Sequence, residues 1–254
     1  MIHYQAQTKD QKGHMLFVHG MCHGAWCWDQ GFMQAFSKMG YHTYAINLKG
    51  HEKPGKNAGI NRVSIEDYVE DVKRALDQID APTILVGHSM GGFVVQKYLE
   101  KNDNCQASIL LGSVPYSGLL NASIRYIGRH PLVGFNLISR DIYGPFVKHA
   151  KELYYDDTDT GSIISYKELM RAESYKALIQ MMFQPVRQAK PESVPMLCVA
   201  AQNDSVITPQ EIEKSADFHR ADFKVLDHVG HNMMLDQRHM DVVEMMKVWL
   251  GQLD

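Results

Sequence analysis

The sequence predicts an α/β fold with a mainly parallel sheet that is flanked by helices. Short, nearly continuous apolar runs alternate along the chain with stretches of helical periodicity, which is typical of such sheets. The interval 114–195 interrupts this alternation, because it carries helical stretches such as residues 166–182 without obvious strands. We therefore expect a helical cap inserted after the sixth strand, while residues 1–113 and 196–254 form the core of the fold.

The strands are predicted from apolar runs that contain many β-branched and aromatic residues. Because these runs are nearly continuous rather than alternating, we expect strands that are buried on both faces of the sheet. One further short strand is expected at residues 3–5. The main runs lie at residues 15–18, 41–48, 84–86, 109–111, 196–201 and 223–226.

The helices are predicted from apolar residues that recur at three- and four-residue steps. The clearest helix covers residues 65–79, with Ser64 as its N-cap and Asp67 where a capping box places an acidic side chain. A second helix begins at Met90, directly after a predicted strand, and residues 242–250 form a third at the end of the chain.

The composition is that of an ordinary globular protein and excludes several classes of partner. With 254 residues, 45% hydrophobic and 22% charged, the chain is neither disordered nor collagenous. The net charge of −3 comes without a basic block, so we expect no nucleic-acid partner. Neither a signal peptide nor the roughly 18 apolar residues of a membrane span are found. The four cysteines lack a paired spacing, which favours reduced thiols in a cytoplasmic protein.

A glycine-rich turn between a predicted strand and a predicted helix carries the strongest chemical signal. Residues 87–92 read Gly-His-Ser-Met-Gly-Gly, which contains G-x-S-x-G in the context that a nucleophile elbow requires. Such a turn holds the serine in a strained conformation, and Gly87 and Gly91 leave room for the neighbouring backbone. Ser89 is therefore predicted to be a nucleophile at the start of a helix, where developing negative charge is favoured.

A serine hydroxyl needs a general base and a third group that orients this base. Asp204 follows the predicted strand at 196–201, and His231 follows the predicted strand at 223–226. Serine, acid and histidine thus occur in the chain order that enzymes with this elbow use. Asp204 and His231 are therefore predicted to complete a catalytic triad.

Neighbouring residues offer alternatives for the base and the acid. His228 lies three residues before His231, but Gly230 suits a loop that must project the next residue into a site. Asp227 and Asp236 are nearby acids, and we interpret both as surface or capping residues. Neither is therefore preferred as the acid of the triad.

The segment after the first main apolar run is predicted to complete an oxyanion hole. A small residue at Gly20 lets the backbone turn an N–H toward the site, where it would act together with the N–H of Met90. His19 and His23 are four residues apart, a spacing that suits metal ligands on a helix. Because this segment leaves a strand and no third ligand is apparent, we expect no metal.

Together these residues resemble the α/β-hydrolase superfamily over essentially the whole chain. Within it, residues 19–26, His-Gly-Met-Cys-His-Gly-Ala-Trp, are similar to the H-G-x-C-H-G-[AG]-W segment of the plant methylesterase and hydroxynitrile lyase group. The resemblance implies an α/β-hydrolase fold and the following site: nucleophile Ser89, acid Asp204, base His231, oxyanion donors Met21 and Met90, and substrate contacts at Gly20, Met21 and Met90.

The sequence departs from this group at several positions. Residues 47–52 read Asn-Leu-Lys-Gly-His-Glu where the superfamily often has Asp-x-x-G-H-G, so the role of this loop is open. The plant esterases usually carry Leu where this chain has Met90. The lyases carry Thr in place of Gly20 and Lys in place of Asn232, so both marks of a lyase are missing. A serine at the elbow also argues against the dehalogenases, which use Asp there.

We therefore expect a serine carboxylesterase that cleaves small, largely apolar esters through an acyl-enzyme and needs no cofactor. A non-catalytic small-molecule receptor, and a hydrolase of lactones, amides or C–C bonds, are the alternatives. The acyl and alcohol groups and the oligomeric state, a homodimer included, stay open. The interval 114–195 contains several tyrosines, which indicate either an apolar pocket or packing alone. They are Tyr116, Tyr126, Tyr143, Tyr154 and Tyr155.

Overall fold

The computed structural model describes residues 1–254 except 56, 134–139, 156–158 and 254. Its strands are β1 (Ile2–Tyr4), β2 (Gly13–Val18), β3 (Tyr41–Ile46), β4 (Thr83–His88), β5 (Ala107–Leu111), β6 (Met196–Ala201) and β7 (Asp222–Leu226). In the described residues they form one seven-stranded sheet in the order β1-β3-β2-β4-β5-β6-β7. β1 pairs antiparallel with β3, and all other pairs are parallel. The predicted mainly parallel α/β sheet is confirmed.

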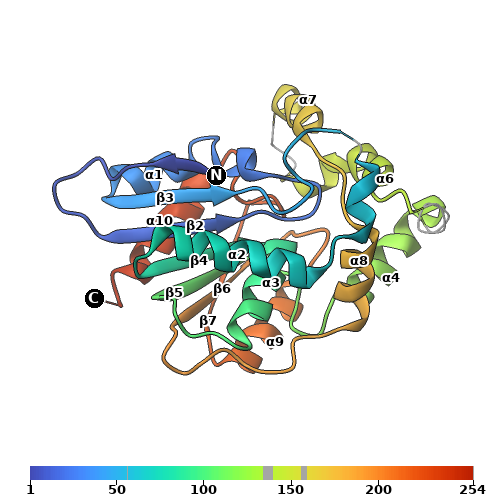
Figure 1. Cartoon of the computed structure of the whole chain (residues 1–254). Coiled ribbons are helices and arrows are strands. Elements are labelled where there is room, and N and C mark those ends of the chain that lie inside the picture. Colours follow the sequence, from blue (N-terminus) through green and yellow to red (C-terminus); the bar gives the residue numbers. More distant parts are fainter. Residues whose placement is uncertain (56, 134–139, 156–158, 254) are drawn as a thin grey trace.

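Helices pack on both faces of this sheet (Figure 1). They are α1 (Phe32–Lys38) and α10 (His239–Leu250) on one face, and α2 (Ile65–Ile79), α3 (Met90–Leu99) and α9 (Pro209–His219) on the other. Successive side chains of β2 point to opposite faces of the sheet. Phe17 packs in the core around α1 and α10, whereas Leu16 packs in the core around α2 and α3. This two-sided burial explains why the central strands have continuous apolar sequences.

Burial on both faces does not extend to the edge of the sheet. β4, β5 and β6 are buried along their whole length, but each residue of β7 is exposed or half-buried. The prediction of full burial is therefore wrong for β7. The reason is its position, because an edge strand has one neighbouring strand and is covered less completely by helices.

The predicted start of α2 is confirmed in detail. The Ser64 hydroxyl accepts a hydrogen bond from the Asp67 N–H at 3.2 Å, and the Ser64 N–H donates to the Asp67 carboxylate at 2.9 Å. These two bonds satisfy backbone groups that the first turn of a helix leaves without partners. Among the residues that the structure describes, no helix is both long and apolar enough to cross a membrane.

The described residues between β5 and β6 form helices that gather at one end of the sheet (Figure 1). These helices are α4 (Leu120–Arg129), α6 (Tyr143–Lys148), a 3₁₀ helix (Ala150–Leu153), α7 (Thr160–Leu169) and α8 (Tyr175–Phe183). The insertion follows β5, the fifth strand in chain order, so the expected position after a sixth strand is wrong. The strand that follows the insertion, β6, is the sixth in chain order.

The helical stretch predicted for residues 166–182 is two helices rather than one. α7 ends at Leu169, and α8 begins after Ser174, whose hydroxyl accepts a hydrogen bond from the Ala177 N–H at 3.1 Å. Between them, the backbone of Arg171 pairs with Gly55 in an isolated β-bridge. Residues 170–174 therefore leave the helical path because they bond to another part of the chain.

Candidate active site

Ser89 lies at the sharp turn from β4 into α3. Its backbone φ is +52° and its ψ is −117°, a conformation that residues other than glycine rarely adopt. The glycines around it are needed for space, since a Cβ on Gly87 would lie 2.7 Å from the Gly91 carbonyl oxygen. A Cβ on Gly91 would lie 2.2 Å from the Val18 carbonyl oxygen. The structure thus places Ser89 in the strained turn that the motif predicts.

The three residues predicted as a triad form a continuous chain of hydrogen bonds. His231 Nε2 lies 3.0 Å from Ser89 Oγ, and His231 Nδ1 lies 2.7 Å from Asp204 Oδ2. Asp204 Oδ1 accepts hydrogen bonds from the N–H groups of Val206 at 2.7 Å and Ile207 at 3.0 Å. With the carboxylate fixed in this way, its other oxygen orients Nδ1–H and leaves Nε2 facing the serine.

The alternative bases and acids lie outside this chain of hydrogen bonds. His228 is exposed, and its Nδ1 lies 2.9 Å from the hydroxyl of Tyr155. Asp227 is exposed as well. Asp236, however, is buried, so its interpretation as a surface residue is wrong. Its carboxylate accepts hydrogen bonds from the N–H groups of Gly230 at 3.0 Å and Tyr155 at 3.3 Å, and thereby holds the loop that leads to His231.

His88 is part of the site although sequence reasoning assigned it no role. Its Nε2 lies 2.9 Å from the carbonyl oxygen of His231, which can only accept, so His88 donates this hydrogen bond. Burial and the neighbouring His231 hold the pKa of His88 well below its usual value, so the ring stays neutral. The one available signal was its place between Gly87 and Ser89, and G-x-S-x-G leaves that position unspecified.

The glycine at position 20 lies directly against the elbow. A Cβ added to Gly20 would lie 2.8 Å from His88 Nδ1 and 3.0 Å from the Cβ of Ser89. A residue with a side chain, such as the threonine of the lyase group, would therefore require His88 or Ser89 to move. In this structure, glycine at position 20 therefore fits where a larger residue would not fit without such a movement.

The loop that follows β2 is held by histidine side chains rather than by regular secondary structure. The Gly20 carbonyl accepts from His19 Nδ1 at 2.9 Å, and the Met21 carbonyl accepts from His23 Nδ1 at 2.7 Å. His19 Nε2 in turn accepts the N–H of Leu48 at 3.1 Å. Burial lowers the pKa of His23 to about 4 and that of His19 well below its usual value. Both rings are therefore neutral, and each forms hydrogen bonds with backbone groups.

The loop at residues 47–52, whose role the sequence left open, supports this same segment. Asn47 Oδ1 accepts the N–H of Ala25 at 2.8 Å, and Leu48 bonds to His19 as described above. His51 is fully buried, with its Nε2 3.2 Å from the carboxylate of Glu173. The loop thus links the segment after β2 to the helical insertion.

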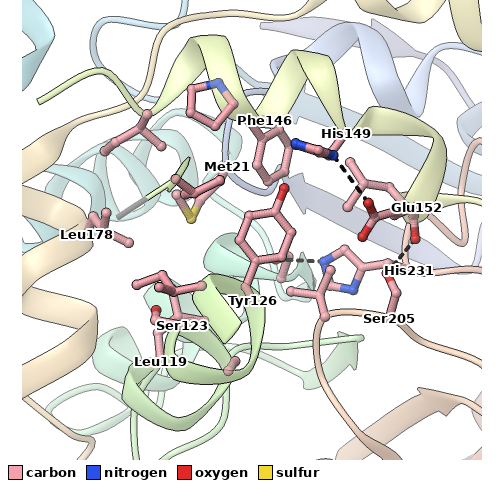
Figure 2. A pocket seen from close by; sticks show the side chains of 18 of the residues that line it. Met21, Leu119, Ser123, Tyr126, Phe146, His149, Glu152, Leu178, Ser205 and His231 are labelled. Carbon is pink, nitrogen blue, oxygen red and sulfur yellow. Dashed lines mark hydrogen bonds and ion pairs between the residues drawn. The ribbon is translucent and has the colours of Figure 1, made fainter. Parts of the chain in front are cut away.

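A cavity opens over Ser89 and His231 beneath the helical insertion (Figure 2). Of the predicted substrate contacts, Met21 belongs to the described residues that line it, whereas Gly20 and Met90 do not. The lining is mainly apolar and includes Leu119, Ala122, Ile142, Phe146, Leu178 and Met182.

The tyrosines of the insertion divide between the two roles that the sequence left open. Tyr126 lines the cavity. Tyr116 instead stacks on Phe218 with ring centroids 4.2 Å apart, and Tyr154 stacks on Tyr166 at 6.0 Å. Tyr116 and Tyr154 are thus packing residues, whereas Tyr126 faces the cavity.

A polar group interrupts the apolar wall of the cavity. Glu152 Oε1 lies 2.9 Å from His130 Nε2 and 3.3 Å from His149 Nδ1, and Figure 2 shows the His149 contact. Two imidazoles and a carboxylate are ligand types that zinc accepts, so these side chains could hold a metal ion. The three side chains also satisfy one another by hydrogen bonding. Sequence reasoning missed this group because His130 lies far along the chain from His149 and Glu152.

The chain is similar to known hydrolases. A family model described as the alpha/beta hydrolase family matches residues 15–245. Methylesterase 10 of Arabidopsis thaliana is 33% identical over 105 residues, which cover 39% of this chain and 37% of that protein. Methyl jasmonate esterase 1 of Vitis vinifera is 35% identical over 91 residues, covering 35% and 34%. The matches thus span about a third of the length of these relatives.

A solved structure with the same fold covers nearly the whole chain. The thermophilic esterase from Thermogutta terrifontis, studied with malate bound, superposes with a TM-score of 0.73 at 18% sequence identity. The superposition covers 96% of this chain and 91% of that one. At this identity the likeness shows a shared fold.

Proposed function

Since the chain belongs to the alpha/beta hydrolase family, we propose that it is a serine carboxylesterase that cleaves small, largely apolar esters through an acyl-enzyme. The observation that carries this proposal is the chain of hydrogen bonds from Ser89 through His231 to Asp204. Ser89 and His231 line a mainly apolar cavity. The esterase names of the relatives support the same class of reaction.

In the proposed first step, Ser89 Oγ attacks the carbonyl carbon of an ester held in the cavity. His231 Nε2 accepts the hydroxyl proton, and the Asp204 carboxylate stabilises the imidazolium that forms. The carbonyl π electrons move to its oxygen, and the N–H groups of Met21 and Met90 stabilise this oxyanion. Fixed donors of this kind act most strongly where water is excluded.

In the proposed second step, the tetrahedral intermediate collapses and the ester C–O bond breaks. The imidazolium of His231 gives its proton to the departing alcohol, leaving the acyl group on Ser89. A water molecule then attacks the acyl carbon while His231 takes its proton, the bond to Ser89 Oγ breaks, His231 returns the proton to Ser89, and the carboxylic acid leaves. His88 and Asp236 support this cycle by holding the backbone on either side of the base.

The residues around the site favour ester hydrolysis over cyanohydrin cleavage. In the hydroxynitrile lyases that this chain resembles, a cationic lysine stabilises the departing cyanide. This chain has the neutral Asn232 at that position. A charge-assisted contact is roughly twice as strong as a neutral one, and the difference counts most in a dry site. Gly20 supplies no hydroxyl, and its surroundings leave no space for one.

The proposal is tested with p-nitrophenyl esters of increasing acyl length and with a fluorophosphonate that labels activated serines. We expect hydrolysis of short esters and a single adduct whose peptide mapping identifies Ser89. A non-catalytic receptor would show neither. Amides, lactones and mandelonitrile in the same assay separate the other reaction classes, and release of cyanide at the rate of ester hydrolysis would contradict the assignment.

A further inference from the structure

The break between α7 and α8 buries a carboxylate that the proposed reaction does not use. The side chain of Glu173 is 0% exposed. Its Oε1 accepts hydrogen bonds from the Tyr68 hydroxyl at 3.0 Å and from the Ser174 N–H at 2.7 Å. Its Oε2 accepts from the Cys22 N–H at 3.1 Å and from His51 Nε2 at 3.2 Å. A buried carboxylate is costly unless it is fully paired, and here four donors pair it.

The four donors come from four separate parts of the molecule. They belong to helix α2, the start of α8, the loop after β3 and the loop after β2. The most distant in sequence is Cys22, which is 151 residues from Glu173. Burial and the nearby Glu173 carboxylate raise the pKa of Tyr68, which keeps the phenol protonated as a donor.

Cys22 directly follows Met21, the proposed oxyanion donor on this side of the site. Its φ is +58°, in the left-handed region that side chains other than those of Asn and Asp rarely adopt. Its N–H is bound by Glu173, and its carbonyl accepts the N–H of Arg171 at 2.9 Å. Both contacts come from residues 170–174 of the insertion, which therefore holds Cys22 in this conformation.

The peptide groups around Met21 are fixed in series. The Gly20–Met21 peptide, which carries the proposed donor N–H, is held through the Gly20 carbonyl by His19. The next peptide, Met21–Cys22, is held through its carbonyl by His23 and through its N–H by Glu173. A displacement of this second peptide would shift the Met21 Cα, and the first peptide ends at the same atom.

We propose that Glu173 is a positioning residue for the oxyanion hole, acting through Cys22 on the N–H of Met21. Glu173 is not among the described residues that line the cavity, so it acts without touching the substrate. This inference rests on the proposed esterase function. Its distinctive consequence is that Glu173 stabilises the tetrahedral state more than the bound substrate.

The test is Glu173→Gln, assayed with a trifluoromethyl ketone and the matching methyl ketone. Ser89 Oγ adds to the carbonyl carbon of the fluorinated ketone, and the carbonyl oxygen becomes an oxyanion in the proposed oxyanion hole. Removing an oxyanion donor costs about 10²–10³-fold in kcat, so misplacing one should lower kcat about 10–100-fold and leave KM nearly unchanged. Inhibition by the fluorinated ketone should weaken by the same factor, and inhibition by the methyl ketone should not change.

Tyr68→Phe provides the matched control. It removes a buried hydrogen bond from Oε1 of the same carboxylate and leaves the Oε2 contact with Cys22 in place. We expect its thermal stability to fall while kcat and the affinity for the trifluoromethyl ketone stay near the wild-type values. An equal loss in both variants, or equal weakening of both ketones, would make Glu173 a merely structural residue and overturn the proposal.

Glu173→Asp decides the question if the glutamine variant does not fold. It keeps the charge but withdraws the carboxylate by one methylene, so we expect the trifluoromethyl ketone to bind several-fold more weakly, in parallel with kcat. Wild-type affinity would contradict the proposal. Failure of the wild-type protein itself to hydrolyse esters or to take up a fluorophosphonate would instead overturn the proposed function.

Discussion

The turn at residues 87–92 and the loop at residues 19–24 meet at the same site, but different interactions hold them. The turn is held by its own glycines and by the strands beside it, with the Ser89 N–H donating to the Leu111 carbonyl at 3.1 Å. The loop depends on Leu48 and on Glu173, which are 29 and 151 residues from their partners. Ser89 is thus positioned by glycines and by backbone contacts with the adjacent strands, whereas the segment of Met21 is held through the side chains of His19 and Glu173.

This difference teaches where substitutions can reach the chemistry. We expect changes near Ser89 to act directly on this proposed nucleophile. We expect changes in the helical insertion to reach the proposed oxyanion donor Met21 through the contacts of Arg171 and Glu173 with Cys22. The two regions also touch each other, because Gly20 lies directly against the side chains of His88 and Ser89, so their close approach depends on the absence of a side chain at position 20.

The largest expected loss of activity comes from a change in the turn at residues 87–92. Ser89→Ala removes the nucleophile, and we expect kcat/KM to fall by about 10⁴-fold or more, since binding and the oxyanion donors alone remain. Removing the hydroxyl leaves the core intact, so the thermal midpoint should stay near that of the wild type. Ester hydrolysis by the purified variant measures this, and retention of wild-type turnover would show that Ser89 is not the nucleophile.

Asp204→Asn probes the acid that orients the base. The amide can donate where the carboxylate accepts, so it favours the unproductive tautomer of His231, and we expect kcat to fall by about 10³–10⁴-fold. Steady-state kinetics on the same ester give the comparison with Ser89→Ala. An unchanged kcat would reassign the acid, and Asp227→Asn and Asp236→Asn would then be measured next.

Gly20→Ala tests the direct contact between the two regions. The added Cβ must displace His88 or Ser89, and a displacement near 1 Å at reacting groups can cost about 10²-fold, so we expect a 10–100-fold loss in kcat. Gly128→Ala in α4 is the matched control, because its added Cβ would meet nothing within 4 Å. Equal kinetics for the two variants would show that the Gly20 contact is unimportant.

The last expected effect concerns the acid stability of the loop at residues 19–24 rather than turnover. The folded pKa of His23 is about 4, below the ordinary value of about 6.5, so between these limits the unfolded chain binds a proton that the folded chain does not. Stability is therefore lost as the pH falls below about 6.5, by up to about 3 kcal/mol at pH 4. His23→Asn, which keeps a donor for the Met21 carbonyl, should flatten this dependence.

Urea unfolding of wild type and His23→Asn at a series of pH values measures the difference. A parallel decline of the two curves would show that His23 does not contribute to acid lability. His219→Asn is the comparison outside the site, since burial also lowers the pKa of His219 to about 4. We expect a similar flattening there without any change in ester hydrolysis.

Much of the fold followed from local patterns. The run at residues 196–201 coincides with β6 because an uninterrupted apolar segment begins after Pro195 and ends before Gln202. The capping box at Ser64 and Asp67 specified the start of α2, since both partners lie within one helical turn. The strained turn at Ser89 was readable for the same reason: glycine spacing, strand and helix are all adjacent in sequence.

Other features could not be read from local patterns. The apolar sequence of β7 did not reveal its place at the edge of the sheet, and the periodicity of residues 166–182 did not reveal the break at residues 170–174. Both depend on which parts of the chain become neighbours. His88 was likewise missed, because its partner, the carbonyl of His231, is 143 residues away.

By itself, therefore, the sequence determined the α/β architecture, the elbow at Ser89 and the order of the candidate triad, because each is written in residues that are close in sequence or in a fixed chain order. Only the tertiary structure decided that Glu173 meets Cys22, that His88 binds the carbonyl of His231 and that His130, His149 and Glu152 lie together. A buried polar group takes whichever donor or acceptor the fold brings to it, and sequence spacing does not specify that partner.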